Sequence, residues 1–164
     1  MRPRHTPTGR AVTELILAAF RLNGRLLVAG DQLTRDLGLS SARWQVMGAL
    51  ADGPLPAAQI ARNMGLTRQS VQRMVDVLAE EQLVTFAENP YHQRAKLVRL
   101  SERGTELLGE VTRRQATWAN QLAKGLSPHE FSAAVRLMET VRQRLEKLAG
   151  KEKRYGHCRS HERL

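Results

Sequence analysis

The stretch from residue 65 to residue 83, GLTRQSVQRMVDVLAEEQL, constrains the fold most, because it gives one helix two different faces. Its apolar residues follow the three- and four-residue spacing of a helix, which predicts a buried face. They are Val71, Met74, Val75 and Leu78. The first turns carry arginine and amide side chains on the other side, without a carboxylate. Such a face suits the DNA major groove, where Arg pairs with guanine and Gln with adenine. An ordinary surface helix is the alternative.

A short helix precedes this stretch and completes a helix-turn-helix pattern. It has Pro56 at its start and stops at Gly65, and the Thr67 hydroxyl is placed to cap the second helix. In this arrangement the first helix braces the second against the groove. The predicted DNA-binding residues of the second helix are Thr67, Arg68, Gln69, Ser70, Gln72 and Arg73.

A β-hairpin is predicted directly after the second helix. Residues 83–86 and 96–100 have the composition of strands, and the sequence NPYH at 89–92 is typical of a turn between them. Arg94 lies near the tip with Lys96 beside it, where a cation can contact a phosphate or enter a narrow minor groove. This pattern predicts a basic wing that binds DNA. A solvated hairpin with incidental bases is the alternative.

Long apolar helices are expected on both sides of this central region. Residues 10–37 carry more apolar side chains than one helix face normally needs. Ser127 and Glu130 form a capping box ahead of a last helix with a coiled-coil-like apolar stripe. The apolar surplus at both ends favours packing against a second copy of the chain over deep burial within one subunit.

The charge of the chain favours a polyanionic partner. The 164 residues carry a formal net charge of +10, and 41% of them are hydrophobic, which suits one compact domain with a core. Nucleic acid is favoured over a membrane, since no apolar stretch approaches the length of a membrane span. Part of the charge lies in the two ends, for which RNA binding or a solubilising role stays open.

Enzyme, cofactor and metal motifs do not appear in the sequence. There is no Walker loop, no nucleophile elbow, no zinc-protease motif and no dinucleotide glycine pattern, so we expect no catalytic residue, no cofactor and no enzyme. His157, Cys158 and His161 lie close together but lack a fourth ligand at a recognisable spacing, so no metal site is expected. The single cysteine fits a reducing cytoplasm, and no signal peptide is predicted.

Three runs carry a resemblance to a known family. SSARWQVMGAL, QIARNMGLTRQSVQRMVDVLAEEQLV and NPYHQRAKLVRLSERG resemble the MarR (multiple antibiotic resistance regulator) family of winged helix-turn-helix transcription factors. The resemblance runs from about Leu15 through Leu148 and implies a mainly α fold with a small β-hairpin wing. It also implies an obligate homodimer, formed by the first and last helices, that binds a near-palindromic operator in double-stranded DNA. It aligns residues 67–73 with the recognition helix and Arg94 with the arginine at the wing tip.

Two positions depart from the family pattern. His92 stands where the family usually has an aspartate two residues before the wing arginine, so a carboxylate that commonly steadies the wing is missing. Gln82 stands where the recognition helix usually ends with glycine. If this position keeps a positive φ, a non-glycine residue there costs about 1 kcal/mol. The helix would otherwise end in a slightly different way.

The expected organisation is a basic flexible N-terminus, a single winged-helix regulator domain and a basic flexible tail. These occupy residues 1–9, 10–148 and 149–164, with the DNA-binding lobe at about 40–101 and the dimerisation helices at about 10–37 and 102–148.

The expected function is that of a cytoplasmic, sequence-specific, dimeric transcriptional regulator, a repressor for which a small aromatic molecule is a candidate effector. Trp44, Met47 and Trp118 lie on helices that could line a cleft for such a molecule, although side chains of this kind are more often core residues. A nonspecific nucleic-acid-binding protein and a winged-helix adaptor that binds a protein partner are the alternatives.

Overall fold

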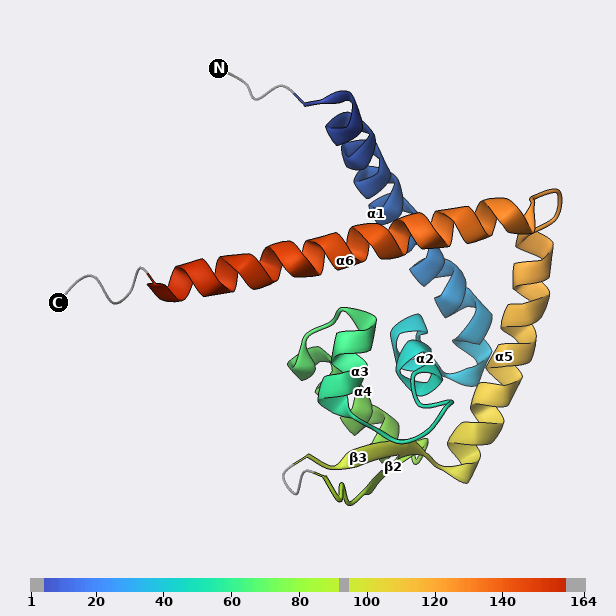
Figure 1. The fold of residues 1–164 in the computed structure, drawn as a ribbon. Helices are drawn as coiled ribbons and strands as arrows, with labels where there is room; N and C mark the ends of the chain where they lie inside the picture. The colour runs from blue at the N-terminus through green and yellow to red at the C-terminus, as the bar shows by residue number, and fades with distance from the viewer. Residues whose placement is uncertain (1–4, 92–94, 159–164) are drawn as a thin grey trace. The chain divides into compact units, whose positions relative to one another are not determined.

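The computed structural model describes residues 5–91 and 95–158 and is mainly helical with one small sheet (Figure 1). The chain divides after Trp118 into two compact units. In chain order the elements are α1 (Pro7–Thr34), the 3-10 turn η1 (Arg35–Leu37), α2 (Ser41–Gly48), β1 (Leu55–Pro56), α3 (Ala57–Met64), α4 (Arg68–Glu80), β2 (Val84–Ala87), β3 (Leu97–Leu100), α5 (Glu102–Leu122) and α6 (Pro128–Cys158). The predicted fold class is confirmed.

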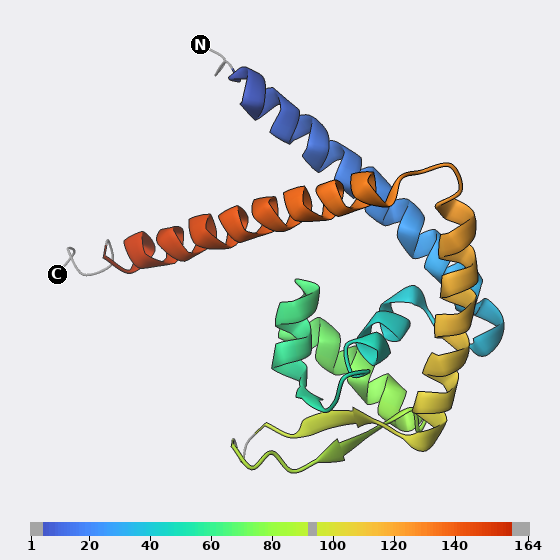
Figure 2. The same ribbon diagram turned by 45° about the vertical axis from the view of Figure 1, so that its right-hand side comes forward.

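The core of the first unit joins α2, α3 and α4 to the sheet and to the first half of α5. Met47, Ile60, Leu78 and Val111 are fully buried in it. Figure 2 shows the three short helices gathered on one side of the hairpin. The apolar face of α4 that the sequence predicts is therefore the face that attaches this helix to the rest of the unit.

The sheet has three antiparallel strands in the order β1-β3-β2. The hairpin pairs Val84 with Leu100 and Phe86 with Val98, which confirms the predicted strands to within one residue. The very short β1 adds to the other edge of β3, where Leu55 pairs with Val98. This third strand is absent from the sequence prediction, and it ties the segment before α3 to the wing.

The two helices of the helix-turn-helix end in the same backbone motif. At the end of α3, Gly65 has φ 65° and the Leu66 N–H donates to the Ala61 carbonyl at 2.9 Å. At the end of α4, Gln82 has φ 60° and the Leu83 N–H donates to the Leu78 carbonyl at 2.8 Å. Both are Schellman motifs, in which glycine normally takes the left-handed position.

Gln82 is, among the residues that the structure describes, the one non-glycine residue with a positive φ. The position therefore keeps the conformation of the family's glycine, and the alternative of a differently shaped helix end is wrong. Two buried apolar residues flank the motif, since Leu78 and Leu83 are at most 3% exposed. Their burial holds the turn in place although its central residue has a Cβ.

Side-chain hydrogen bonds connect α1 to α2 and α2 to α4. The Asp31 carboxylate of α1 accepts from the Ser41 backbone N–H at 2.6 Å, so α1 supplies a cap for the first turn of α2. The Arg43 guanidinium of α2 pairs with Glu81 at the end of α4 and donates to the Gly38 carbonyl. α1, α2 and α4 are thus linked through polar contacts as well as through the core.

A second arginine connects α5 to η1. Arg114 donates to Asp36 at 2.7 Å and to Glu110 at 2.8 Å. Its hydrogen bond to Asp36 holds the pKa of that carboxyl below its ordinary value, and the Arg114 and Arg113 hydrogen bonds do the same to the pKa of Glu110. The exposed carboxylates thereby stay ionised into the acid range.

The long helices α1 and α6 leave much apolar surface exposed. α1 buries only Gly30 and Thr34, and its Phe20 is 71% exposed. On α6 the larger apolar side chains are also exposed: Phe131, Val135, Leu137, Met138, Leu145 and Leu148.

The helix ends at α1 and α6 follow local cap signals. The Thr6 hydroxyl caps α1, which starts at Pro7, slightly before the expected residue 10. The predicted capping box before α6 is confirmed, because the Ser127 N–H donates to Glu130 at 3.1 Å and the Ser127 hydroxyl accepts from the His129 N–H at 3.2 Å. α6 continues past residue 148 into the segment expected to be a tail, where lysine, glutamate and arginine favour helix.

Candidate nucleic-acid interface

The recognition helix begins as the sequence predicts. Thr67 has extended backbone angles, and its hydroxyl accepts from the Ser70 N–H at 3.1 Å. With α3 ending at Gly65, only a short turn separates the two helices. The cap fixes the first turn of α4, so the side chains that follow it project from a rigid backbone.

The first turns of α4 present polar side chains to solvent. Val71, Val75 and Leu78 are fully buried on the inner side, whereas Arg68, Gln69, Ser70 and Arg73 are exposed. Gln69 and Arg73 are four residues apart and therefore lie on one face of the helix. An amide and a guanidinium on adjacent turns are the groups that can read adenine and guanine from the major groove.

Gln72 differs from the other predicted contacts. It is half-buried, and its Nε2 donates to the Asp76 carboxylate at 2.8 Å. Bidentate recognition of adenine needs the donor and the acceptor of the amide together. The contact with Asp76 leaves the second N–H and the oxygen of the amide, so it limits the orientation of Gln72 without removing either group.

The structure brings the wing and the start of the recognition helix together around a hollow of about 380 Å³. Arg68 and Gln72 of α4 line it together with Phe86 and Lys96 of the hairpin. The predicted cations Arg68 and Lys96 thus lie on one surface although they are far apart in sequence. Arg94 and His92 lie outside the described residues.

The cations of this surface have no acidic partner among the side chains that the structure describes. Within residues 5–91 and 95–149 no ion pair engages Arg68, Arg73 or Lys96, whereas Arg43 and Arg114 are both paired. An unpaired guanidinium or ammonium group can neutralise a phosphate and release its counterion. The electrostatics of the surface therefore suit a nucleic acid.

Arg99 is a further exposed cation of the hairpin, on the face of β3 opposite Lys96 and Val98, and it is absent from the sequence prediction. It is exposed on β3, and its Nε donates to the Thr85 hydroxyl of the paired strand at 3.0 Å. The alternation of side chains along β3 points to it, because Arg99 follows the buried Val98.

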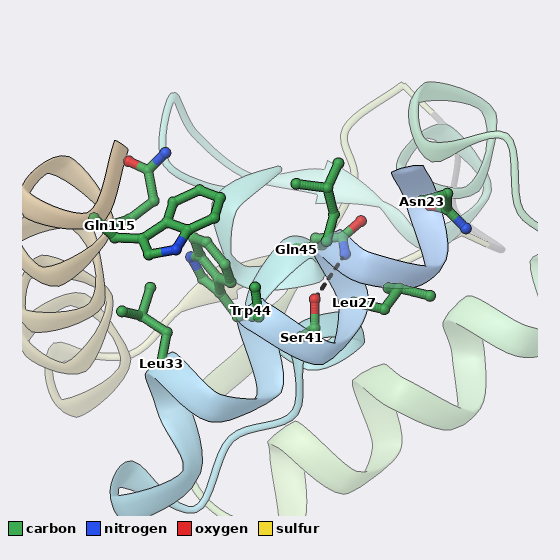
Figure 3. Close-up of a pocket in the computed structure, with 11 residues that line it drawn as sticks. Asn23, Leu27, Leu33, Ser41, Trp44, Gln45 and Gln115 are labelled. Atoms are coloured by element: carbon green, nitrogen blue, oxygen red, sulfur yellow. Dashed lines mark hydrogen bonds between the residues drawn. The ribbon is translucent and has the colours of Figure 1, made fainter. Parts of the chain in front are cut away.

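A second hollow, of about 290 Å³, lies between α1, α2 and α5 (Figure 3). Its apolar walls include Leu27 and Leu33 of α1, Trp44 of α2 and Trp118 of α5. Two of the three residues suggested for a cleft are thus in its wall, whereas Met47 is fully buried in the core. Met47 lies three residues further along α2, where its side chain packs into the core that this helix shares with α3 and α4.

Known proteins match both the sequence and the fold. The sequence model of the MarR family matches residues 37–95, from the end of η1 to just before β3. An uncharacterized protein of Mycobacterium bovis is 33% identical over 122 residues, which cover 74% of this chain and 85% of that protein. The chain belongs to the MarR family.

Solved structures of MarR-family proteins share the fold. A MarR/EmrR family transcriptional regulator from Acinetobacter sp. ADP1 has a TM-score of 0.73 at 20% identity, covering 84% of this chain and 96% of that one. The transcriptional repressor CouR, bound to a 23-mer DNA duplex, has a TM-score of 0.70 at 20% identity, covering 85% of this chain and 99% of that one. The family and the fold are those of transcription regulators rather than enzymes.

No described helix is long and apolar enough to cross a membrane. No group of three or more potential metal ligands occurs among the same residues.

Proposed function

We propose that the protein is a homodimeric repressor that binds a near-palindromic operator in double-stranded DNA and is released by a small ligand. One observation carries the proposal. The capped first turns of α4 expose Arg68, Gln69 and Arg73, none of which pairs with a described acidic side chain, next to a hairpin that carries Lys96. This surface combines groups that read bases with groups that neutralise phosphates.

Exposed apolar surface supports the dimer. Phe20 of α1 is 71% exposed and Val135 of α6 is 63% exposed, and each lies among further exposed apolar residues of its helix. Contiguous apolar surface of this kind marks an interaction site, and a second copy of the chain offers the same surface in return. Sedimentation equilibrium should give a dimer, and a monomer at micromolar concentration would contradict this part of the proposal.

The hollow beside Trp44 and Trp118 is the proposed ligand site. It lies between α1, which we assign to the dimer interface, and α2, which packs on the recognition helix. A ligand there can release DNA only if it binds the DNA-free arrangement of the lobes more tightly than the DNA-bound one.

The DNA-binding experiment starts with duplexes selected from a random pool. A two-fold dimer should select an inverted repeat with half-site centres about ten base pairs apart. Fluorescence anisotropy on the selected and the scrambled duplex then measures specificity across a salt series. Equal affinity for the two duplexes would favour a nonspecific nucleic-acid-binding protein, and no affinity for either would favour a protein-binding adaptor.

Three variants separate base reading from phosphate binding. Arg68→Ala should cost about 1–3 kcal/mol of discrimination at one base position. Lys96→Ala should weaken binding to both duplexes alike and lower the salt slope by about one ion. Arg113→Ala is the control, because Arg113 is an exposed arginine of α5 that pairs with Glu110.

A further inference from the structure

Leu66 is an exposed apolar residue at the start of the recognition helix. It lies between Gly65, which ends α3, and the cap residue Thr67, and it is 42% exposed. From Gly65 to Arg73, a run that the structure describes completely, it is the one exposed large apolar residue, since Val71 is fully buried. An apolar group therefore lies among the side chains that are predicted to read DNA.

The backbone motif around Leu66 does not require this exposure. The Leu66 N–H donates to the Ala61 carbonyl in the Schellman motif of α3, and the Leu83 N–H donates to the Leu78 carbonyl in that of α4. A hydrophobic contact between these two positions commonly accompanies the motif. Leu83 is nevertheless only 3% exposed, so the two equivalent leucines differ greatly in burial. The contact within the turn leaves part of the Leu66 side chain free for a partner.

The surface around Leu66 is otherwise polar. The Thr67 hydroxyl accepts from the Ser70 N–H, and Arg68 and Gln69 are exposed in the first turn of α4. A partner that covers this surface must therefore offer hydrogen-bonding groups and an apolar group side by side.

The DNA major groove offers this combination. In a helix-turn-helix the N-terminal residues of the second helix contact base edges. The base edges in the groove carry donors and acceptors, together with the C5-methyl group of thymine, which apolar side chains contact in direct readout. Contact between this methyl group and Leu66 removes apolar surface of both groups from water.

We propose that Leu66 is a specificity-determining residue that contacts the C5-methyl group of one thymine in each half-site of the operator. The inference rests on the proposed function and names a base that the start of the recognition helix selects. Transfer of one methyl group out of water corresponds to about fourfold in affinity. The contact adds this preference to the hydrogen bonds of the exposed arginine and amide groups.

Deoxyuridine in place of thymine tests the contact, because it removes only the C5-methyl group and keeps the base pair. Fluorescence anisotropy measures the affinity of the full-length protein for the selected operator and for duplexes in which each thymine is replaced in turn. One position in each half-site should weaken binding about fourfold, and replacement in both half-sites should weaken it about fifteenfold. A scan in which no replacement weakens binding would overturn the inference, and this scan needs no variant protein.

Variants then assign the methyl group to Leu66. Leu66→Ala should bind the thymine and the deoxyuridine duplex equally well, whereas Leu66→Met keeps a large apolar side chain and should retain the preference. Val77→Ala is the matched control, because Val77 is 40% exposed near the other end of α4 and its loss should leave the preference unchanged. The preference is a ratio of two affinities of the same protein, so a lower stability of a variant does not alter it. An unchanged preference for thymine in Leu66→Ala would contradict the assignment.

The outcome is separable from that of the proposed function. Equal affinity for the selected and the scrambled duplex, before any methyl group is removed, would overturn both proposals. Specific binding without any effect of deoxyuridine would overturn only the contact of Leu66 and would leave the regulator in place.

Discussion

Replacing Gln82 by glycine should stabilise the protein. Gln82 takes the left-handed position of the Schellman motif that ends α4, with φ 60°. Its side chain is exposed and makes no hydrogen bond within the described residues, while its backbone carbonyl accepts from the Ser101 hydroxyl at 2.7 Å. Glycine can keep every backbone contact of this turn and removes only the Cβ that opposes it.

The size of the effect follows from two opposing contributions. The left-handed conformation costs an L-residue roughly 1–2 kcal/mol. Glycine has a more disordered unfolded state, which costs about 0.4–1 kcal/mol. The free energy of unfolding should therefore rise by about 0.5–1 kcal/mol in Gln82→Gly. Urea denaturation measures this as a higher midpoint at unchanged slope, and it requires equal protein concentrations because a dimer is stabilised by mass action.

Three control variants make the measurement specific. Gln82→Ala keeps a Cβ and should stay within about 0.5 kcal/mol of the wild type. Gly65→Ala puts a Cβ into the equivalent turn of α3 and should, by the same two contributions, cost about 0.5–1 kcal/mol. Glu80→Gly, in the last turn of the same helix, should cost up to about 1 kcal/mol. If Gln82→Gly and Glu80→Gly lower the urea midpoint alike, the turn does not have the conformation described and the reasoning is refuted.

Further predictions concern α5 and its contacts. Gly104→Ala places a Cβ 1.9 Å from the Leu83 carbonyl and should destabilise by about 1–3 kcal/mol, whereas Gly109→Ala meets only the end of a flexible side chain and should stabilise by up to about 1 kcal/mol in urea denaturation. Equal effects of the two substitutions would contradict the close approach. Because Arg114 lowers the pKa of Asp36, ionised Asp36 stabilises the folded protein at pH values above the pKa that Asp36 has in the unfolded chain. This stabilisation is lost as the pH falls through the lower pKa that Asp36 has in the folded protein. The urea midpoint of Asp36→Asn should therefore fall less than that of the wild type between about pH 5 and pH 2, and parallel curves would count against the pair.

Features set by neighbouring residues could be predicted from the sequence. The caps at Thr67 and Ser127 are confirmed, because a cap needs only a hydroxyl at the right distance from the first free N–H groups. The buried face of α4 is confirmed for the same kind of reason, since helical spacing alone places Val71 and Leu78 on one side.

Features set by distant residues could not be predicted in this way. The strand β1 has two residues, one of them proline, and it exists only because Leu55 meets Val98 across the fold. The half-buried position of Gln72 depends on the hairpin beside it, and the burial of Met47 depends on which side of α2 packs on α4. Periodicity places a residue on a face but does not identify the element that covers that face.

The cap that Asp31 supplies to α2 has a mechanical consequence. Because Ser41 is held by α1 and Arg43 of the same helix holds the end of α4, the base of α1 and the recognition helix tilt together as one rigid body. α1 has 28 residues and is therefore about 42 Å long, so a tilt of this rigid body by about 5° displaces the far end of α1 by about 4 Å. In the proposed dimer the far ends of the two α1 helices are held together. A small tilt of each rigid body would then change the spacing between the two recognition helices, whereas the spacing of successive major grooves on the DNA duplex is fixed.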